Sequence, residues 1–580
     1  MTTSITDQHA QALDRRRRLL NHYDAGLLSY RPSILSPEEF AEVVLDFTRW
    51  DDFSFDTVMW DIAGGVACYP SNVVPHYPSL QEWLDAGNDF LHPIISGSRQ
   101  RGLEVFLSFR VNAGQDPNFD SVSFKEDHEE WLVNFNEDDQ SPAKRYLERL
   151  DGEVSQLKWD YANPQLRAHQ VAALQELVTN YDLDGIQLDF ARGVPCLRVG
   201  HQWVMRDHLT QFMRDVRAMM RRREVERGKP LLLAVRIAES IAGCHFDGID
   251  IETWVDDDLV DMTILGCRSF DVELAAFKEV VAASGVKLYP CHDNHHSSDG
   301  YKCTPLKVLR GIASNWWHQG ADGISLFNFT CSNGEAEERS GLRQRPISPC
   351  HQQDWETNLT FLSEAADPEK LAGQPKTFVL QRRAGGAPWE FGYPENGLTM
   401  DHAFQNVNLL SSLPARLGQH GNDCTFLHVY LGEKLASLEG RQGILRVLIS
   451  DGPPQAVDET ASKPESDSGR DSDRDSDRDW APDRLERGLI RRNPYVLGDG
   501  LWTVPLTRQT ANSLEVRINN IRLALDGTGP DGKEGWLVYP VEPPQLARGV
   551  NLLTFRLRDG SGAQISIEKV ELDLTGSVNL

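Results

Sequence analysis

The sequence predicts a (β/α)8 barrel followed by an all-β sandwich, and three observations support this fold class. Eight short apolar segments, each long enough for one strand, occur in the first 330 residues. Segments with helical spacing of apolar residues separate most of them, and such alternation predicts a parallel sheet closed into a barrel. After about residue 375 the helical pattern ends, and β-rich segments separated by Gly, Pro and Asp indicate a sandwich.

The expected barrel strands follow one another with connections that must be right-handed. They are Gly26–Tyr30, Thr57–Asp61, Leu103–Arg110, Gly185–Phe190, Leu231–Ala238, Asp261–Leu265, Val286–Pro290 and Gly323–Phe329. Helices are expected between them from start signals and apolar spacing. These signals are the capping box at Ser36-Pro37-Glu38-Glu39, the pairs Asn163-Pro164 and Thr304-Pro305, and the apolar stripe Leu209, Phe212, Val216 and Met219.

The sandwich is expected to contain at least six strands. They are Phe426–Leu431, Ile444–Ser450, Leu514–Leu523, Trp536–Val541, Leu552–Arg558 and Ile565–Leu574. Residues 467–479 repeat Asp, Ser and Arg and have no apolar residue to bury, so a disordered loop is expected around them, over residues 455–486. The expected organisation is an N-terminal extension over residues 1–19, a barrel over 20–370 and a sandwich over 371–580.

Composition excludes several classes of protein. The 580 residues have a net charge of −27, which disfavours binding to nucleic acid. No run of 18 apolar residues would span a membrane, and Arg15 to Arg18 are not followed by the apolar segment of a secretory signal. Nine cysteines without paired spacing indicate buried thiols in a reducing compartment. We expect a cytoplasmic protein without a cofactor, and a secreted mature form stays open as the alternative.

Two carboxylates follow neighbouring expected strands. Asp189 ends the fourth strand, and Glu239 follows the fifth. The C-terminal ends of barrel strands form the active face, and adjacent strands lie about 4.8 Å apart. Cleavage of a glycosidic bond requires a pair of carboxylates, about 5–5.5 Å apart in retaining enzymes. The pair therefore predicts a glycoside hydrolase with Asp189 and Glu239 as catalytic residues. A retaining mechanism is favoured, and inversion stays open. The structural alternative is that Asp189 caps a turn and Glu239 pairs with an arginine.

Other polar or aromatic residues at strand ends are candidates for contacts with substrate. They are Trp60, Asp61, Arg110, Asn112, Arg192, Arg236, His292, Asp293 and Asn328. The alternative for the arginines is a set of structural ion pairs. His292, His295 and His296 lack the spacing that makes histidines converge, so no metal site is expected. The long loop from Asn112 to Tyr161 contributes Trp131 and Trp159, which are expected either to stack on a sugar or to pack the loop.

Competing functions have weaker support in the sequence. The chain has no Gly-rich phosphate loop and no Gly-x-Ser-x-Gly elbow. Position 191 is Ala, where a chitinase-type strand would have Glu. A barrel that binds carbohydrate without turnover remains the main alternative, and a lyase or isomerase that uses the histidines near residue 292 is the third class. The sequence does not predict the sugar or the oligomeric state.

The segments Leu157–Pro164 and Tyr181–Arg192 resemble the barrel proteins called glycosyl hydrolase-like family 10, as do Asp250–Trp254 and Gly320–Asn328. This resemblance covers roughly residues 20–370 and implies a carbohydrate-active barrel distantly similar to α-amylases and α-galactosidases. Asp189, Glu239 and Asp293 match the positions of the amylase nucleophile, acid/base and third carboxylate, whereas Gln187 replaces an amylase arginine. The C-terminal segments resemble the galactose-binding-like sandwiches of glycosidases, which implies either carbohydrate binding or packing against the barrel.

Overall fold

The computed structural model describes most of the barrel and the strands of the sandwich. The described residues are 4–23, 36–49, 54–63, 65–76, 80–112, 124–125, 127–133, 158–191, 194–198, 200–266, 269–293, 304–330, 355–381, 410–413, 415–418, 423–434, 436, 442–451, 512–528, 536–558 and 565–575. The expected Asp-, Ser- and Arg-rich loop at 455–486 lies outside them.

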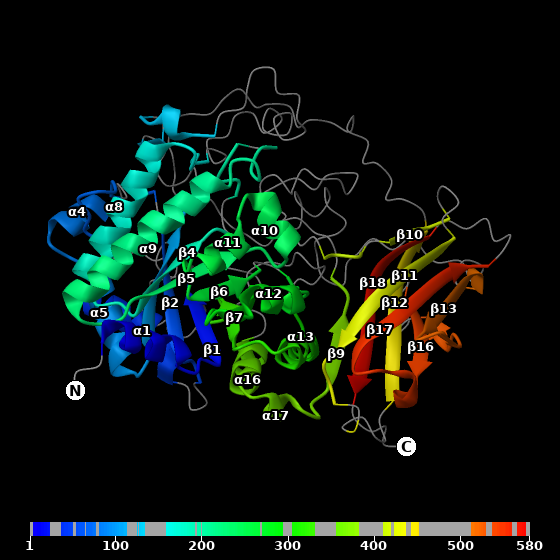
Figure 1. Cartoon of the computed structure of the whole chain (residues 1–580). Helices are drawn as coiled ribbons and strands as arrows, with labels where there is room; N and C mark the ends of the chain where they lie inside the picture. Colours follow the sequence, from blue (N-terminus) through cyan, green and yellow to red (C-terminus); the bar gives the residue numbers. More distant parts are fainter. Residues whose placement is uncertain are drawn as a thin grey trace, which may run out of the picture.

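Eight parallel strands form a closed barrel in sequence order, which confirms the predicted fold (Figure 1). The strands are β1 Leu19–Tyr23, β2 Thr57–Ala63, β3 Glu104–Arg110, β4 Gly185–Asp189, β5 Leu232–Ile237, β6 Met262–Leu265, β7 Lys287–Asp293 and β8 Ile324–Phe327. The main helices around and after the barrel are α1 Ile5–Asp14, α3 Pro37–Val44, α4 Gln81–Asp85, α5 Leu91–Gln100, α8 Pro164–Asn180, α9 Asp207–Arg227, α10 Ile241–Asp247, α11 Ile251–Asp256, α12 Leu274–Val281, α13 Leu306–Gln319, α16 Trp355–Ala365 and α17 Pro368–Leu371.

The first strand was predicted wrongly. The segment Gly26–Tyr30 lies outside the described residues, and β1 is formed instead by Leu19–Tyr23, which pairs with both β2 and β8. This segment places Leu20 and His22 on the same face of the strand, and Leu20 packs in the barrel interior. The polar residues Asn21 and His22 interrupt the apolar run, so composition alone gave a weak strand signal.

Alternation along the strands separates two apolar cores. Side chains on one face pack between the sheet and the helices, and those on the other face fill the barrel interior. On β2, for example, Val58 and Trp60 belong to the outer core, whereas Met59 belongs to the inner one. Residues two positions further along an inward face therefore also point inward, which places Asp61 at the C-terminal end of the barrel interior.

Helix α1 packs at the N-terminal end of the barrel through charged side chains. His9 contacts Glu224 at 2.5 Å and Asp261 at 3.0 Å, and Arg217 holds the other oxygen of Asp261 at 2.7 Å. Burial opposes a charge on the His9 ring, but hydrogen bonds with Asp261 and Glu224 outweigh this effect and raise the pKa of His9 to about 9. The N-terminal extension is thus part of the barrel structure.

The C-terminal region consists of two antiparallel sheets that share one apolar core, as expected for a sandwich. One sheet has the order β10, β18, β12, β16 and β15, with β9 also paired to β18; the other has the order β11, β17, β13 and β14. The strands are β9 Lys376–Val379, β10 Ala415–Leu417, β11 Cys424–Leu431, β12 Gln442–Asp451, β13 Leu514–Ile518, β14 Ile521–Arg522, β15 Gly527–Thr528, β16 Trp536–Val541, β17 Gly549–Leu557 and β18 Ile565–Thr575.

The expected strand Leu514–Leu523 is in fact a tight hairpin. Asn519 and Asn520 have positive φ angles of 47° and 67°, and they connect β13 to β14 as a two-residue turn. Asn tolerates this left-handed conformation better than most residues, and two consecutive positive φ angles match the twist of a hairpin. The pair Asn519-Asn520 was a turn signal that the β-rich pattern around it concealed.

The sandwich meets the barrel along α13 (Figure 1). A Cβ atom at Gly311 would lie 2.4 Å from the carbonyl oxygen of Thr377 on β9, so the two backbones approach as closely as glycine allows. Further along α13, the Asn315 side chain accepts a hydrogen bond of 2.8 Å from the amide of Gly432, and His318 contacts the Tyr430 hydroxyl at 2.9 Å. Helix α13 is therefore the main contact between the two parts.

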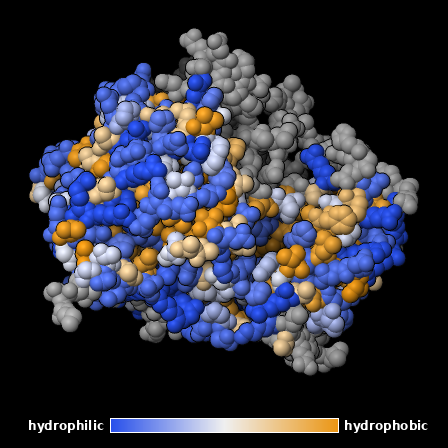
Figure 2. All heavy atoms as spheres, in the orientation of Figure 1, coloured by the Kyte–Doolittle hydropathy of each residue, from blue (hydrophilic) through white to orange (hydrophobic). Residues whose placement is uncertain are grey.

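The visible surface is predominantly hydrophilic over the barrel helices, with apolar residues scattered among them (Figure 2). Among the helices that the structure describes, none combines the length and apolar character needed to cross a bilayer.

The charged contact of His9 predicts a pH-dependent contribution to stability. Because the folded pKa lies above the ordinary value of 6.5, this contribution is complete below pH 6.5 and is lost as the pH rises through about 9. We expect His9→Gln to cost roughly 2–4 kcal/mol at pH 6 and much less at pH 10, since one pKa unit corresponds to about 1.4 kcal/mol. Denaturant unfolding of both proteins at the two pH values measures this difference. The exposed His92 provides the control His92→Gln, and an equal loss at both pH values would contradict the prediction.

The contact at Gly311 predicts that a single methyl group weakens docking of the sandwich. In Gly311→Ala the new Cβ must displace the backbone of Thr377, and we expect a loss of roughly 1–3 kcal/mol in unfolding free energy. Ser314→Ala on the same helix is the matched control, because it introduces no new atom. Equal stabilities of the two variants in thermal or denaturant unfolding would show that the approach of α13 to β9 is not tight.

Candidate active site

Charged side chains occupy inward-facing positions at the C-terminal ends of β2 to β5. The residues are Asp61, Arg110, Asp189 and Arg236, and the two acidic residues alternate with the two arginines around the barrel. Arg110, Asp189 and Arg236 are register partners across β3, β4 and β5, so their backbones lie side by side. The structure thus brings together four of the residues that the sequence proposed for the site.

Two ion pairs organise these four residues. Arg110 Nε lies 2.6 Å from Asp61 Oδ2, and Arg236 Nη1 lies 3.2 Å from Asp189 Oδ2. Both side chains of the second pair are completely buried. Arg236 also donates a hydrogen bond of 3.3 Å to the carbonyl of Gly266, and its guanidinium lies 4.2 Å from the centre of the Phe327 ring. These contacts hold Arg236 on several sides and fix one oxygen of Asp189.

The second oxygen of Asp189 has a different environment. Oδ1 is buried, and no described residue forms a hydrogen bond with it. Beneath it in the barrel interior, the amide of Gln187 is also buried without a hydrogen-bond partner in the described part of the chain. A buried carboxylate oxygen without a partner is rare in folded proteins and marks a position where a ligand or water can bind.

Glu239 lies at the start of the loop after β5 and is completely buried. The hydroxyl of Ser269 is 3.5 Å from its Oε2, and its main-chain carbonyl accepts a hydrogen bond of 2.9 Å from the amide of Glu273. Glycine at position 266 lets the loop after β6 pass close to Glu239, since a Cβ there would lie 3.4 Å from the Glu239 Cβ. The loops after β5 and β6 therefore position this carboxylate together.

Asp247 is a carboxylate near Glu239 that sequence reasoning did not select. It lies on α10, only 6% exposed, and burial together with the negative charge of Glu239 raises its pKa well above the usual range. No motif marks this residue, because its relation to Glu239 depends on how the short helix α10 turns back.

The residues predicted on β7 and after β8 lie at the same end of the barrel. His292 and Asp293 end β7 and are nearly completely buried, as is Asn328 after β8. Asp293 faces the barrel interior, whereas His292 faces the outer core beside Phe270, so the prediction that His292 contacts substrate is wrong. Burial lowers the pKa of His292 to about 3, so this imidazole is neutral, and its Nε2 lies 3.3 Å from the Thr304 hydroxyl. Asn328 has a φ angle of 62°, and its main-chain N–H donates a hydrogen bond of 2.8 Å to the main-chain carbonyl of His22 on β1.

Two candidate residues have surroundings that differ from those expected of a sugar-binding group. Trp60 is on the outer face of β2, where its ring packs near Tyr23 and its Nε1 donates a hydrogen bond of 3.3 Å to Ser98 on α5. The ring is completely buried between sheet and helix, so the prediction that Trp60 contacts substrate is wrong. The Asn112 side chain bonds to main-chain groups of Trp159 at 2.8 Å and of Pro195 at 2.8 Å, and so joins the loops after β3 and β4.

The two tryptophans of the loop after β3 form an aromatic cluster. Their ring centroids are 6.1 Å apart, the His128 ring stacks on Trp131 at 4.0 Å, and the Lys125 ammonium lies 4.8 Å from the Trp159 ring. Trp131 is 8% exposed and Trp159 is 1% exposed. Their described contacts fit the alternative in which these rings pack the loop.

Three further residues named from the sequence lie outside the described residues, namely Arg192, His295 and His296.

Residues 42–202 match the family described as Glycosyl hydrolase-like 10. The matched segment includes β2, β3 and β4, and therefore Asp61, Arg110 and Asp189. The match lies within the first half of the closed barrel, and this part of the chain is similar to glycosyl hydrolase-like barrels.

Individual relatives are remote. The chain is 27% identical over 147 residues to an S-layer-related protein of Niallia circulans, and it spans only 9% of that protein's length. Among solved structures it is similar to α-L-fucosidase isoenzyme 2 of Paenibacillus thiaminolyticus, with 15% identity, a TM-score of 0.38, and coverage of 61% of this chain and 49% of the fucosidase. A family 18 N-acetylglucosaminidase of Paenibacillus barengoltzii has 10% identity and a TM-score of 0.29, with 57% of this chain and 99% of that enzyme covered.

The contacts of Asn112 predict a structural effect of its removal. Asn112→Ala leaves buried main-chain groups of Trp159 and Pro195 without their side-chain partner, and we expect a loss of roughly 1–3 kcal/mol in unfolding free energy. Denaturant unfolding measures this loss, and Asn180→Ala at the exposed C-terminal end of α8 serves as the control. Unchanged stability with weaker substrate binding would instead assign Asn112 to the substrate site.

Proposed function

We propose that the barrel is a glycoside hydrolase that cleaves a poly- or oligosaccharide with Asp189 and Glu239 as its catalytic residues. The observation on which this proposal depends is the placement of two buried carboxylates at the C-terminal ends of adjacent parallel strands. A barrel presents its site at this end, and glycoside hydrolysis needs such a pair. The match of residues 42–202 to a glycosyl hydrolase-like family supports the same reaction class.

In this proposal Asp189 is the nucleophile. Arg236 holds Oδ2 and supplies a counter-charge to the ionised carboxylate, which leaves Oδ1 for the anomeric carbon of the sugar. Attack by Oδ1 forms a glycosyl ester with Asp189 while the bond from the anomeric carbon to the leaving oxygen breaks. The guanidinium also limits rotation of the carboxylate, so attack proceeds from one preferred orientation.

Glu239 is the proposed acid/base. Its carboxyl group gives a proton to the leaving oxygen in the first step, and the resulting carboxylate takes a proton from water in the second. That water attacks the anomeric carbon, releases Asp189 and gives a product with the starting anomeric configuration. The loops after β5 and β6 support this role because together they hold the buried Glu239 side chain in one place at the barrel mouth.

The other polar residues at this end of the barrel are proposed to bind sugar hydroxyls. Asp61 and Arg110 form an ion pair on the β2 and β3 side, while Asp293 and Asn328 lie on the β7 and β8 side. Charged groups in such pairs retain capacity for further hydrogen bonds. His292 lies on the opposite face of β7 from Asp293, beside the Phe270 and Phe329 rings, so it is not included in this set. Arg192 remains a candidate from the sequence.

A barrel that binds carbohydrate without turnover is the second candidate. The complete burial of both Arg236 and Asp189 favours it, because structural ion pairs inside proteins have this character. The two candidates differ in one respect that is measurable: only the hydrolase consumes its ligand.

Substitution of the two carboxylates distinguishes these candidates once a panel of oligo- and polysaccharides has identified a ligand of the wild type. We expect Glu239→Gln to lower kcat by about 10²–10⁴-fold and Asp189→Asn to lower it at least as much, with little change in ligand affinity. Reducing-end assays measure turnover, and proton NMR of the first product reports its anomeric configuration. An inverted configuration would contradict the role of Asp189 as nucleophile.

The control is Asp182→Asn, which makes the same change at an exposed carboxylate near the opposite end of β4. Because removal of one partner of a buried ion pair can unfold a protein, the thermal stability of Asp189→Asn must be measured in parallel. Near wild-type turnover by a folded Asp189→Asn variant would exclude Asp189 from the mechanism. Binding of a saccharide that the wild type never cleaves would favour the carbohydrate-binding protein.

A further inference from the structure

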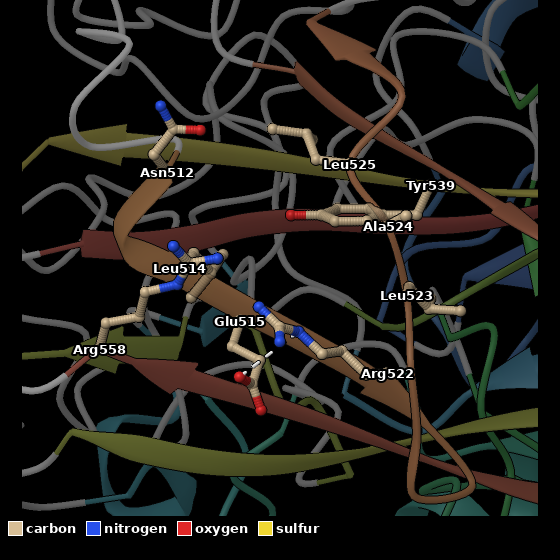
Figure 3. A pocket seen from close by; sticks show the side chains of 9 residues that line it. All are labelled: Asn512, Leu514, Glu515, Arg522, Leu523, Ala524, Leu525, Tyr539 and Arg558. Carbon is tan, nitrogen blue, oxygen red and sulfur yellow. Dashed lines mark ion pairs between the residues drawn. The ribbon is translucent and has the colours of Figure 1, made fainter.

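The sandwich contains a cavity at its edge, away from the barrel site. This cavity, here called the sandwich pocket, has a volume of about 240 Å³ and is lined by residues of β13 and β14 in one sheet and β16 in the other (Figure 3). Leu514 and Leu523 give it apolar walls, and both are nearly completely buried. Arg522, Arg558 and Glu515 contribute the charged groups of the lining.

Tyr539 gives the sandwich pocket a buried polar group. The residue is 2% exposed, and its hydroxyl has no hydrogen-bond partner among the described residues. Burial raises the pKa of this phenol, so the group keeps its proton and can both donate and accept. Figure 3 shows the hydroxyl directed toward the side of the pocket where the guanidinium groups of Arg522 and Arg558 lie. A buried hydroxyl without a partner in this position is suited to a ligand.

The charges around the sandwich pocket favour an anion. Glu515 forms ion pairs with Arg517 at 2.8 Å and with Arg522 at 3.6 Å. The hydrogen bond from Arg517, together with the charges of Arg517, Arg522 and Arg556, lowers the pKa of Glu515. Arg558 adds another exposed guanidinium to the lining, so arginines outnumber the single carboxylate. This local positive excess occurs in a chain whose net charge is −27.

We propose that the sandwich pocket binds one uronic acid, a sugar unit that has a carboxylate. Guanidinium groups recognise carboxylates through paired, charge-assisted hydrogen bonds. The Tyr539 hydroxyl and the Asn512 amide suit sugar hydroxyls, and the leucine side chains suit the C–H face of the ring. A cavity below the roughly 300–1,000 Å³ of sites for drug-sized ligands holds one ring rather than a chain.

The choice of a sugar among small carboxylates rests on the function proposed for the barrel, whereas the anion preference does not. Both parts can be tested by isothermal titration of the Asp189→Asn protein, which cannot turn a substrate over if the barrel proposal is right. Sodium glucuronate is the probe, with glucose and sodium propionate as ligands that lack the carboxylate or the sugar. We expect glucuronate to bind at least tenfold more tightly than either.

Variants of the sandwich pocket then locate the binding. Each variant is introduced into the Asp189→Asn protein. We expect Tyr539→Phe and Arg558→Gln to weaken glucuronate binding at least tenfold. The control Arg416→Gln should not weaken it, because Arg416 is on β10, and β18 and β12 separate β10 from β16 in the same sheet. Tyr539→Phe removes only the hydroxyl, so we expect no loss of thermal stability. Weaker glucuronate binding at unchanged thermal stability would therefore assign the Tyr539 hydroxyl to ligand binding and not to packing.

Several results would overturn the proposal. Absence of glucuronate binding, or binding that survives both pocket variants, would show that the sandwich pocket is not its site. Equal affinity for propionate would remove the sugar from the proposal, and equal affinity for glucose would remove the carboxylate. Failure of the barrel function is recognised separately. It appears either as wild-type turnover by the Asp189→Asn protein or as no turnover by the wild type. Neither result alters the measured binding of glucuronate.

Discussion

The buried ion pair between Arg236 and Asp189 is the interaction on which the arrangement of the barrel mouth depends. A completely buried charge must be paired, and loss of one partner usually costs about 3–5 kcal/mol. Arg236 meets this requirement while it also contacts Gly266 and Phe327, so three strands and a loop hold one carboxylate oxygen. The same contacts that stabilise the barrel therefore orient the group proposed to react. A substitution at this position therefore affects stability as well as chemistry, and the two effects are separated by measuring unfolding and turnover on the same variant.

The sequence predicted the barrel well because its strands are short and nearly continuously apolar, as parallel strands buried on both faces must be. Strands β2 to β8 lie within a few residues of the predicted ranges, and the helices begin at the capping signals of Ser36 and Asn163. The first strand was missed because Asn21 and His22 interrupt its apolar run. In a closed barrel the mouth also tolerates polar inward-facing residues, so hydropathy is least informative where the site lies.

The spatial grouping of the candidate residues was predicted in part, for a reason that strand geometry explains. Position at a strand end selected Asp61, Arg110, Asp189 and Arg236 correctly as a spatial group, but it also selected Trp60, whose side chain points the other way. Trp60 and Asp61 are consecutive residues of one strand, and consecutive side chains of a strand point to opposite faces, so both could not face the barrel interior. The proximity of Asp247 and Ser269 to Glu239 could not have been predicted, because it depends on the paths of two loops.

The contact between the sandwich and the barrel bears on how the two proposed sites would act together. Backbone meets backbone at Gly311, and hydrogen bonds reach the sandwich from Asn315 and His318 on the same helix, so the parts meet along a packed surface that includes direct backbone contact. A polysaccharide bound at one of two linked sites reaches the other site at an effective concentration that depends on the distance and orientation between the two sites. If both proposed sites bind saccharide, a weak uronic acid site in the sandwich would raise the occupancy of the barrel by an acidic polysaccharide long enough to reach both. The net charge of −27 repels an acidic polysaccharide, and the local excess of arginines at the sandwich pocket offsets this repulsion there.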